Sequence, residues 1–214
     1  MHIQSNREGK GEITKMTTKE QAFFECTTWY HGTTLSGWKS ICKLGIRADF
    51  NIGISLDFGN GFYLSNNLEN TERYVNNMMK YSNSDYSEDN IPVIIVFQFC
   101  PYEWIKEGTA YRYFPKYNME FAEFVFENRL NYMSKHIHGY DITAGVTTDT
   151  KPTYLMQQYF LGKIEKSFVL EEFCKSTSVK QICLHNQDLC DIIYPRKAYI
   201  LEGKELNIHD YKQR

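Results

Sequence analysis

The sequence lacks several features that would assign it to a common functional class. Its 6 cysteines include no C-x-x-C pair, and their spacing fits neither a zinc site nor a disulfide framework. We therefore expect reduced and mostly buried thiols. The formal net charge is only −2, from 24 basic and 26 acidic residues, so no overall basic field favours a nucleic-acid partner.

Long apolar runs are also missing. The longest one surrounds residues 93–97 and is far too short to span a bilayer. Residues 1–11 contain no apolar stretch of the kind that a signal peptide needs. We therefore expect a cytoplasmic protein with no membrane partner. The 214 residues fit one domain, which we divide into a partly flexible N-terminal extension, 1–25, and a folded part, 26–214.

Short strands and helices are predicted throughout the folded part. We expect strands at 28–31, 62–65, 91–100, 140–146, 179–185 and 196–201, and helices at 18–24, 36–44, 67–80, 118–131, 154–161 and 167–174. Thr18 and Ser36 are the expected N-terminal caps of the first two helices, and Gly45 should end the second. The 91–100 strand should be central because both of its faces are apolar.

This order of elements favours an α+β fold over a doubly wound parallel sheet. No G-x-G-x-x-G fingerprint follows a strand, so a Rossmann fold is not indicated. Asp57-Phe58-Gly59 occurs in kinases, but the phosphate loop, the strand lysine and the H-R-D loop of kinases are absent from the sequence. His136 and His138 could share one face of a strand as metal ligands, yet no third ligand is suitably spaced, so we expect no metal.

Three motifs follow one another with informative spacing. Tyr30-His31-Gly32-Thr33 ends an apolar strand, and residues 59–65 read G-N-G-F-Y-L-S. Thr71 and Tyr74 come eight and eleven positions after Tyr63, on one face of the predicted 67–80 helix. Together these motifs resemble the poly(ADP-ribose) polymerase-like branch of the ADP-ribosyltransferase superfamily, whose motifs are a His-Gly-Thr and a Gly-x-Gly-[Ile/Phe]-Tyr strand.

The chain is also similar to a bacterial, DUF3990-like family of the same superfamily. The shared segments are Asp-Phe-Gly-x-Gly-Phe-Tyr at 57–63, Asn128-Arg129, the Tyr-Asp-Ile…Gly…Asp segment at 140–149, and Gln-x-x-Leu-His at 181–185. The resemblance covers roughly residues 28–195. It implies an ADP-ribosyltransferase-like fold, which is a split antiparallel sheet with flanking helices, for the 26–214 domain.

The resemblance further implies that NAD is a co-substrate and assigns the residues that bind it. His31 would bond the adenosine ribose. The backbone of Gly32 would pair with the nicotinamide carboxamide, and the hydroxyl of Thr71 would add a bond. Tyr63 and Tyr74 would stack on the nicotinamide ring. Thr33, the third residue of the His-Gly-Thr motif, is assigned to the same cofactor-binding set.

The third family motif departs from the pattern. Poly(ADP-ribose)-forming relatives have a glutamate where this chain has Gln181, an amide that can bond a ribose hydroxyl but cannot act as a base. The predicted catalytic residues are therefore Gln181, Tyr63 and a compensating acid, Asp149, with Asp57 as an alternative. Arg129 has two open assignments, which are a pyrophosphate ligand and the cap of a helix end.

The function that the resemblance implies is NAD-dependent mono-ADP-ribosyl transfer to a macromolecule. A protein acceptor is favoured over nucleic acid. Bacterial members of the superfamily act as toxins, as effectors or in phage defence, so an antitoxin or inhibitor protein is an expected partner. Three alternatives stay open: an NAD glycohydrolase, a transferase that modifies nucleic acid, and a pseudoenzyme that binds NAD or ADP-ribose without turnover.

Overall fold

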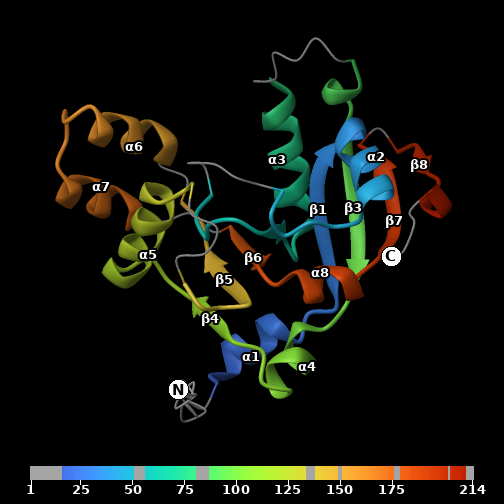
Figure 1. The fold of residues 1–214 in the computed structure, drawn as a ribbon, viewed down its shortest axis with the longest axis horizontal. Coiled ribbons are helices and arrows are strands. Elements are labelled where there is room, and N and C mark those ends of the chain that lie inside the picture. The colour runs from blue at the N-terminus through green and yellow to red at the C-terminus, as the bar shows by residue number, and fades with distance from the viewer. Residues whose placement is uncertain are drawn as a thin grey trace, which may run out of the picture.

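The computed structural model describes residues 16–50, 56–80, 87–133, 138–148, 151–175, 179–201 and 203–210. In these residues the chain forms a mixed α+β fold with two four-stranded sheets and flanking helices (Figure 1). The predicted α+β class is confirmed.

The first sheet is antiparallel throughout and has the order β1-β3-β7-β8. Its strands are β1 (Thr28–Thr34), β3 (Pro92–Gln98), β7 (Pro195–Ile200) and β8 (Glu205–Leu206). β3 lies between β1 and β7, and Val93, Ile94 and Ile95 have no exposed surface. The prediction of a central strand from its apolar sequence is therefore confirmed.

The second sheet has the order β2-β6-β5-β4. Its strands are β2 (Phe62–Leu64), β6 (Lys180–Leu184), β5 (Ile142–Val146) and β4 (Tyr111–Phe114). The β2–β6 and β6–β5 pairs are antiparallel, but β4 pairs with β5 in parallel. The expectation of a wholly antiparallel sheet is wrong at this edge. A helix, α5 (Met119–Leu130), connects β4 to β5, and a crossover of that length joins parallel strands.

The helices pack around the two sheets in separate groups (Figure 1). α2 (Leu35–Leu44) and α3 (Leu68–Lys80) lie against the first sheet. α5, α6 (Pro152–Phe160) and α7 (Lys166–Phe173) form a lobe beside the second sheet. The shorter helices are α1 (Thr18–Phe24), α4 (Pro101–Lys106) and α8 (Gln187–Ile192), and short 3-10 turns occupy Ser87–Asn90 and Ile208–Asp210. None of the described helices is long and apolar enough to cross a membrane.

Two predicted helix starts are wrong by one or two residues. Thr17, rather than Thr18, caps α1, because Glu20 lies three residues after it and completes a capping box. Thr34, rather than Ser36, caps α2, because β1 continues past Gly32 to Thr34 and the chain turns directly into the helix. Gly45 ends α2 as predicted, with a φ of 77° that favours glycine.

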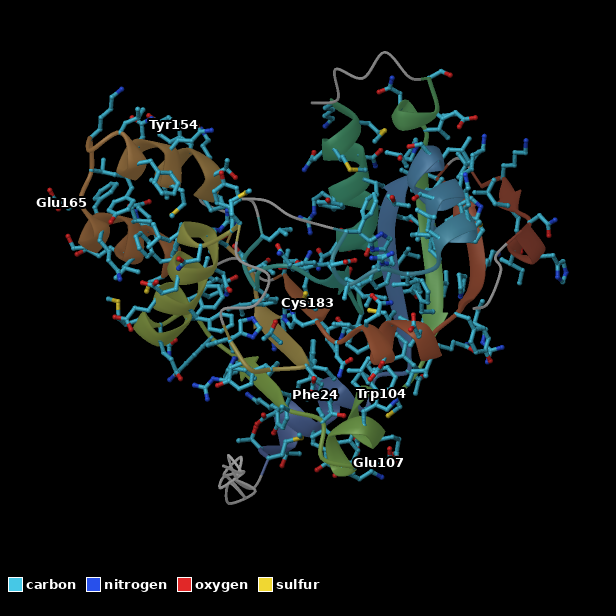
Figure 2. All side chains as sticks on the ribbon, viewed as in Figure 1. Phe24, Trp104, Glu107, Tyr154, Glu165 and Cys183 are labelled. Carbon is cyan, nitrogen blue, oxygen red and sulfur yellow. The ribbon has the colours of Figure 1, made fainter. Side chains whose placement is uncertain are left out.

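Two clusters of buried side chains form the core. The first includes Trp29 and Phe97 of the first sheet together with Phe23 and Phe24 of α1. The second lies under the α5–α7 lobe and includes Phe58, Phe121 and Phe173. Phe23 and Phe24 fall within the predicted N-terminal extension, but both are buried in the first cluster. By contrast, Tyr154 lies at the outer edge of the lobe and is 56% exposed (Figure 2).

Gly61, directly before β2, has no room for a side chain. A Cβ built there would lie 2.2 Å from the Sγ of Cys183 and 2.8 Å from the backbone oxygen of Leu184. We predict that Gly61→Ala lowers the free energy of unfolding by about 1–3 kcal/mol, because β2 must move away from β6. Urea unfolding measures the change. Gly139→Ala is the matched control, since nothing lies within 4 Å of its Cβ, and an equal loss in both variants would contradict the prediction.

Candidate active site

The two sheets meet at one antiparallel bridge between Tyr30 of β1 and Ser65, which follows β2. Tyr30 N–H donates to Ser65 O at 2.7 Å and Ser65 N–H donates to Tyr30 O at 2.9 Å. Continuing this register would place Gly32 opposite Tyr63 and join the sheets by a second pair of bonds. The strands separate instead, so the combined sheet is split at this position.

His31 supplies a side-chain bond where the ladder stops. Its Nδ1 donates to the carbonyl oxygen of Tyr63 at 2.8 Å, and its ring stacks on Phe62 with the centroids 4.4 Å apart. Burial lowers the pKa of His31 to about 4, although the bond to Tyr63 opposes this shift. The imidazole is therefore neutral at pH 7, and its Nε2 is an acceptor.

The carbonyl oxygen of Tyr63 thus accepts a hydrogen bond from the His31 side chain. The backbone of Gly32 therefore has no strand partner on the β2 side. Backbone groups alternate sides along a strand, so the N–H and C=O of Gly32 point the same way as those of Tyr30, away from β3. Among the described residues, none forms a hydrogen bond with these two groups. A Cβ at Gly32 would lie 2.5 Å from Val75 and 3.2 Å from Tyr74, so only glycine lets α3 approach this closely.

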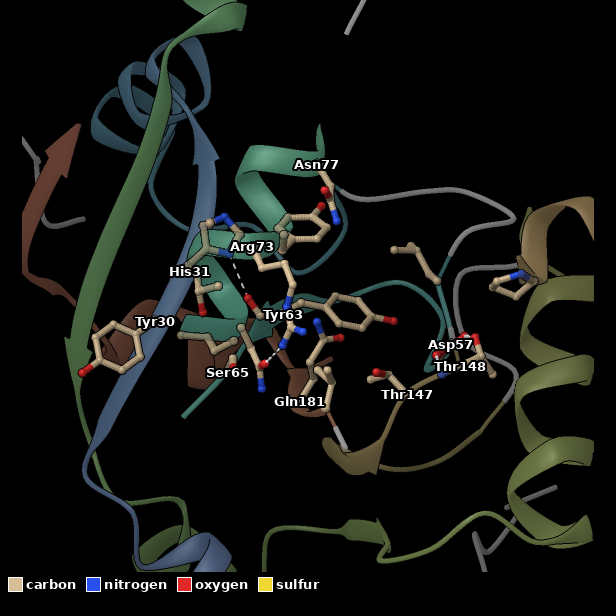
Figure 3. Close-up of a pocket in the computed structure, with 18 of the residues that line it drawn as sticks. Tyr30, His31, Asp57, Tyr63, Ser65, Arg73, Asn77, Thr147, Thr148 and Gln181 are labelled. Carbon is tan, nitrogen blue, oxygen red and sulfur yellow. Dashed lines mark hydrogen bonds between the residues drawn. The ribbon is translucent and has the colours of Figure 1, made fainter. Parts of the chain in front are cut away.

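A cavity of about 710 Å³ opens at the split between the sheets. This volume is within the usual range of about 300–1,000 Å³ for small-molecule sites. Its walls come from β1, β2, α3, β6, the end of α5 and the loop that follows β5. Figure 3 shows His31 and Arg73 on one side, Asp57 and Thr148 on the other, and Tyr63 and Gln181 between them.

Two tyrosines present rings to this cavity in different ways. Tyr63 is partly buried, and its hydroxyl is fully engaged by the neighbouring turn: it donates to Gly59 O at 2.6 Å and accepts from Phe58 N–H at 3.1 Å. Burial, and then the neighbouring Cys183, raise the pKa of Tyr63 well above its usual value, so it stays a neutral phenol. Tyr74 is 53% exposed, so its ring has room to move toward a ligand.

Side chains donate a hydrogen bond to every backbone carbonyl of the turn at residues 57–60. Each of its four consecutive backbone oxygens accepts a hydrogen bond from a different residue. In chain order the donors are Asn128 (3.2 Å), His138 (3.2 Å), Tyr63 (2.6 Å) and His185 (2.6 Å). Because Tyr63 is one of the four, the turn fixes the plane of a ring that lines the cavity.

A buried ion pair closes the far wall of the cavity. Arg129 donates to Asp57 Oδ1 from Nε at 3.0 Å and from Nη2 at 2.5 Å, and its side chain is 2% exposed. Asp57 also accepts from the backbone N–H of Thr148 at 2.6 Å and from its hydroxyl at 2.7 Å. Arg129 thus binds a carboxylate from the last turn of α5. Asp57 ties α5 to the loop that follows β5.

The charges in the cavity are few. Among the described lining residues, only Asp57, Arg73 and Arg129 carry a formal charge once His31 is neutral. Asp57 and Arg129 neutralise one another. Arg73 of α3 donates to the neutral Oδ1 of Asn70, and none of the described residues forms an ion pair with it. The described walls therefore carry one uncompensated positive charge.

The structure brings most of the predicted site residues together. His31, Gly32, Tyr63, Thr71, Tyr74 and Gln181 all line the one cavity, as does the alternative acid Asp57. Thr33 does not line it, because its hydroxyl faces Gly37 at the start of α2. Asp149 and His136 lie outside the described residues. His138 binds a carbonyl, and the described residues contain no cluster of three metal-ligating side chains.

Several lining residues were not foreseen from the sequence. Asn70, Arg73 and Asn77 all line the cavity from α3. Asn70 lies four positions before Tyr74 and Asn77 lies three after it, so helical periodicity could have identified these two. Arg73 directly precedes Tyr74 and carries no such signal. Thr147 and Thr148 carry no such signal, because their position depends on the long-range bonds from Asp57.

Fold and site together define a mixed α+β protein with a ligand-sized cavity, lined by both polar and apolar groups, where its two sheets part. The chain belongs to the family described as "Protein of unknown function (DUF3990)", whose model matches residues 30–194. This match confirms the DUF3990-like resemblance. No curated protein and no solved structure matches the chain.

The Asp57–Arg129 pair should be essential for stability. We predict that Asp57→Asn lowers the free energy of unfolding by about 3–5 kcal/mol, because it leaves the guanidinium of Arg129 buried without a counter-charge. Urea unfolding measures the loss. Asp49→Asn is the matched control, since Asp49 binds Arg47 on the surface and such pairs contribute about 0–1 kcal/mol. A loss below about 1 kcal/mol for Asp57→Asn would show that the pair is not a structural support.

Proposed function

We propose that this protein is an NAD-dependent mono-ADP-ribosyltransferase with an ADP-ribosyltransferase-like split sheet, and that it modifies a macromolecule, with a protein acceptor favoured. One observation carries the proposal. Residues from four separate elements, assigned to NAD by the sequence resemblance alone, line a single cavity. They are His31 and Gly32 of β1, Tyr63 of β2, Thr71 and Tyr74 of α3, and Gln181 of β6.

The walls near Gly32 are chemically suited to a nicotinamide carboxamide. The carboxamide has an acceptor oxygen and a donor NH2 group, and Gly32 presents the complementary N–H and C=O side by side. Thr71 donates its hydroxyl hydrogen to Asn67 O at 3.0 Å, which leaves its oxygen as an acceptor for the same NH2. These three groups would fix both the position and the orientation of the ring.

The aromatic side chains are suited to the ring itself. Tyr63 is held in place through its hydroxyl, and Tyr74 is exposed enough to close over a bound ligand. A cationic nicotinamide between two tyrosine rings gains stacking and cation–π energy, about 0.5–2 kcal/mol for each ring. The neutral Nε2 of His31 would accept a bond from a ribose hydroxyl.

Cleavage of the bond between nicotinamide and ribose has an oxocarbenium-like transition state, so it depends mainly on positioning and electrostatics. In our proposal Gln181 bonds a hydroxyl of the reacting ribose and orients it. Asp149 supplies the negative charge that Gln181 lacks. Asp57 is poorly suited to that role, because Arg129 and Thr148 already occupy its carboxylate.

The resemblance also suggests where such an activity would act. A cytoplasmic toxin, effector or phage-defence enzyme, restrained by an antitoxin or inhibitor protein, is the role consistent with bacterial members of the superfamily. NAD is consumed as a co-substrate, and no metal is needed for this chemistry.

One observation favours a second candidate, a pseudoenzyme that binds NAD or ADP-ribose without turnover. The only carboxylate among the described lining residues is Asp57, which is neutralised. If Asp149 does not reach the ligand, the cavity would bind the dinucleotide but would not stabilise a positively charged transition state.

Incubation with NAD labelled on its adenylate, using a whole-cell lysate as acceptor, separates these functions. We predict label transfer to protein, and a loss of at least about a hundredfold in His31→Ala and Tyr63→Ala, because both remove contacts to the bound dinucleotide. Gln181→Ala and Asp149→Asn should lower the rate without abolishing NAD binding. Tyr194→Ala, on the surface away from the cavity, is the control and should label at the parental rate.

Each alternative has its own outcome in the same assay. Nicotinamide release without label transfer indicates a glycohydrolase, and label lost to nuclease rather than protease indicates a nucleic-acid acceptor. NAD binding by calorimetry without nicotinamide release indicates the pseudoenzyme. Parental labelling by folded His31→Ala or Tyr63→Ala would contradict the site assignment.

A further inference from the structure

Arg73 is an uncompensated positive charge in a cavity whose other described walls are neutral overall. It lies in α3, one residue before Tyr74 and two after Thr71, both of which also line the cavity. Figure 3 shows its side chain extending from α3 into the cavity, between His31 and Gln181. Arg73 is therefore placed to contact whatever the cavity holds.

The surroundings of Arg73 orient it without neutralising it. Its Nη2 donates to Oδ1 of Asn70, one helical turn earlier, and an amide oxygen carries no formal charge. Burial, and then the charge of the adjacent Glu72, raise the pKa of Tyr199 on β7, so Glu72 acts on that tyrosine. The guanidinium thus keeps its charge and most of its five N–H donors for a ligand.

The other arginine of the cavity cannot take this role. Arg129 gives two hydrogen bonds to Asp57 and one to Thr148, and its side chain is 2% exposed. Turning it toward a ligand would leave Asp57 buried and unpaired, at a large energetic cost. Arg129 is therefore unsuited to the pyrophosphate role that the sequence left open for it. Arg73, which the sequence motifs did not identify, is the other arginine among the described lining residues.

We propose that Arg73 binds the diphosphate of the dinucleotide and determines the affinity of the cavity for diphosphate-containing ligands. This inference rests on the proposed function, because it takes NAD as the ligand. A guanidinium binds two phosphate oxygens at once through a planar pair of N–H groups. The doubly negative diphosphate is the part of NAD that the neutral groups at Gly32, Thr71 and His31 do not match. Asn70 holds the guanidinium in place before binding, which lowers the entropy lost on contact.

Calorimetric titration of three ligands tests this role. For Arg73→Gln we expect the dissociation constants of NAD and ADP-ribose to rise together by roughly ten- to a hundredfold, the usual effect of losing charge-assisted bonds. Nicotinamide riboside has no phosphate and carries only the positive charge of its ring, so its affinity should not fall. Arg73→Lys should recover part of the loss, because it restores the charge but not the paired geometry. In the parent, NAD binding should weaken with salt more steeply than in Arg73→Gln.

Lys80→Gln is the matched control, since it removes one positive charge from the last turn of the same helix, outside the cavity lining. Parental NAD affinity in Arg73→Gln, with the parent binding NAD, would overturn this inference and leave the proposed function standing. Unchanged NAD affinity with lost transfer but continued nicotinamide release would also overturn it, because Arg73 would then act on the acceptor. A parent that binds none of the three ligands would overturn the proposed function itself.

Discussion

The hydrogen bond from the imidazole of His31 to the carbonyl of Tyr63 is the interaction on which the site depends. It replaces the ladder bond that Gly32 would otherwise make to the same oxygen, so it lets the two sheets part without leaving that carbonyl unpaired. The cost falls on Gly32, whose N–H and C=O have no partner among the described residues. An unpaired pair of this kind at the edge of a cavity is suited to a ligand that brings one donor and one acceptor.

The remaining motif residues divide into those that line the cavity and those that support it. Asn128, His138 and His185 bind three carbonyls of the turn at 57–60, and Tyr63 binds the fourth. Arg129 binds the Asp57 carboxylate from α5. Residues far apart in the sequence thus converge on a few backbone groups. Their role is to hold the ring of Tyr63 and the loop after β5 at fixed positions around the cavity.

Much of this arrangement could be predicted from the sequence, for reasons that differ between elements. β3 was recognisable because a strand buried on both faces is apolar throughout, and α3 because Asn67 caps it and its cavity face repeats with helical spacing. β4 and α8 were missed, since Tyr111–Phe114 and Gln187–Ile192 are short and depend on their tertiary contacts. The parallel pairing of β4 could not be inferred without knowing that α5 crosses between the strands.

The residues that line the cavity also divide into those that the sequence identifies and those that it does not. His31, Gly32, Tyr63, Thr71 and Tyr74 were identified by motif spacing, and they meet because β1, β2 and α3 pack together at Gly32. Thr33 belongs to the motif but not to the cavity, because its hydroxyl faces Gly37 at the start of α2. The role of Arg129 could not be read from the sequence, since its partner Asp57 lies 72 positions away. The sequence does not single out Arg73, because an exposed helical arginine is ordinarily a solvated surface residue.

The amide of Gly32 gives the most direct measurement of whether this cavity binds a nicotinamide dinucleotide. In a titration of 15N-labelled protein followed by NMR, we predict that the Gly32 N–H resonance shifts on addition of NAD and saturates. Nicotinamide alone should shift the same resonance in the same direction, because the carboxamide is the group that contacts it. Gly139 should not shift. A Gly32 resonance that stays unchanged while NAD saturates the protein would show that the dinucleotide binds elsewhere, and it would contradict the assignment of this cavity to NAD.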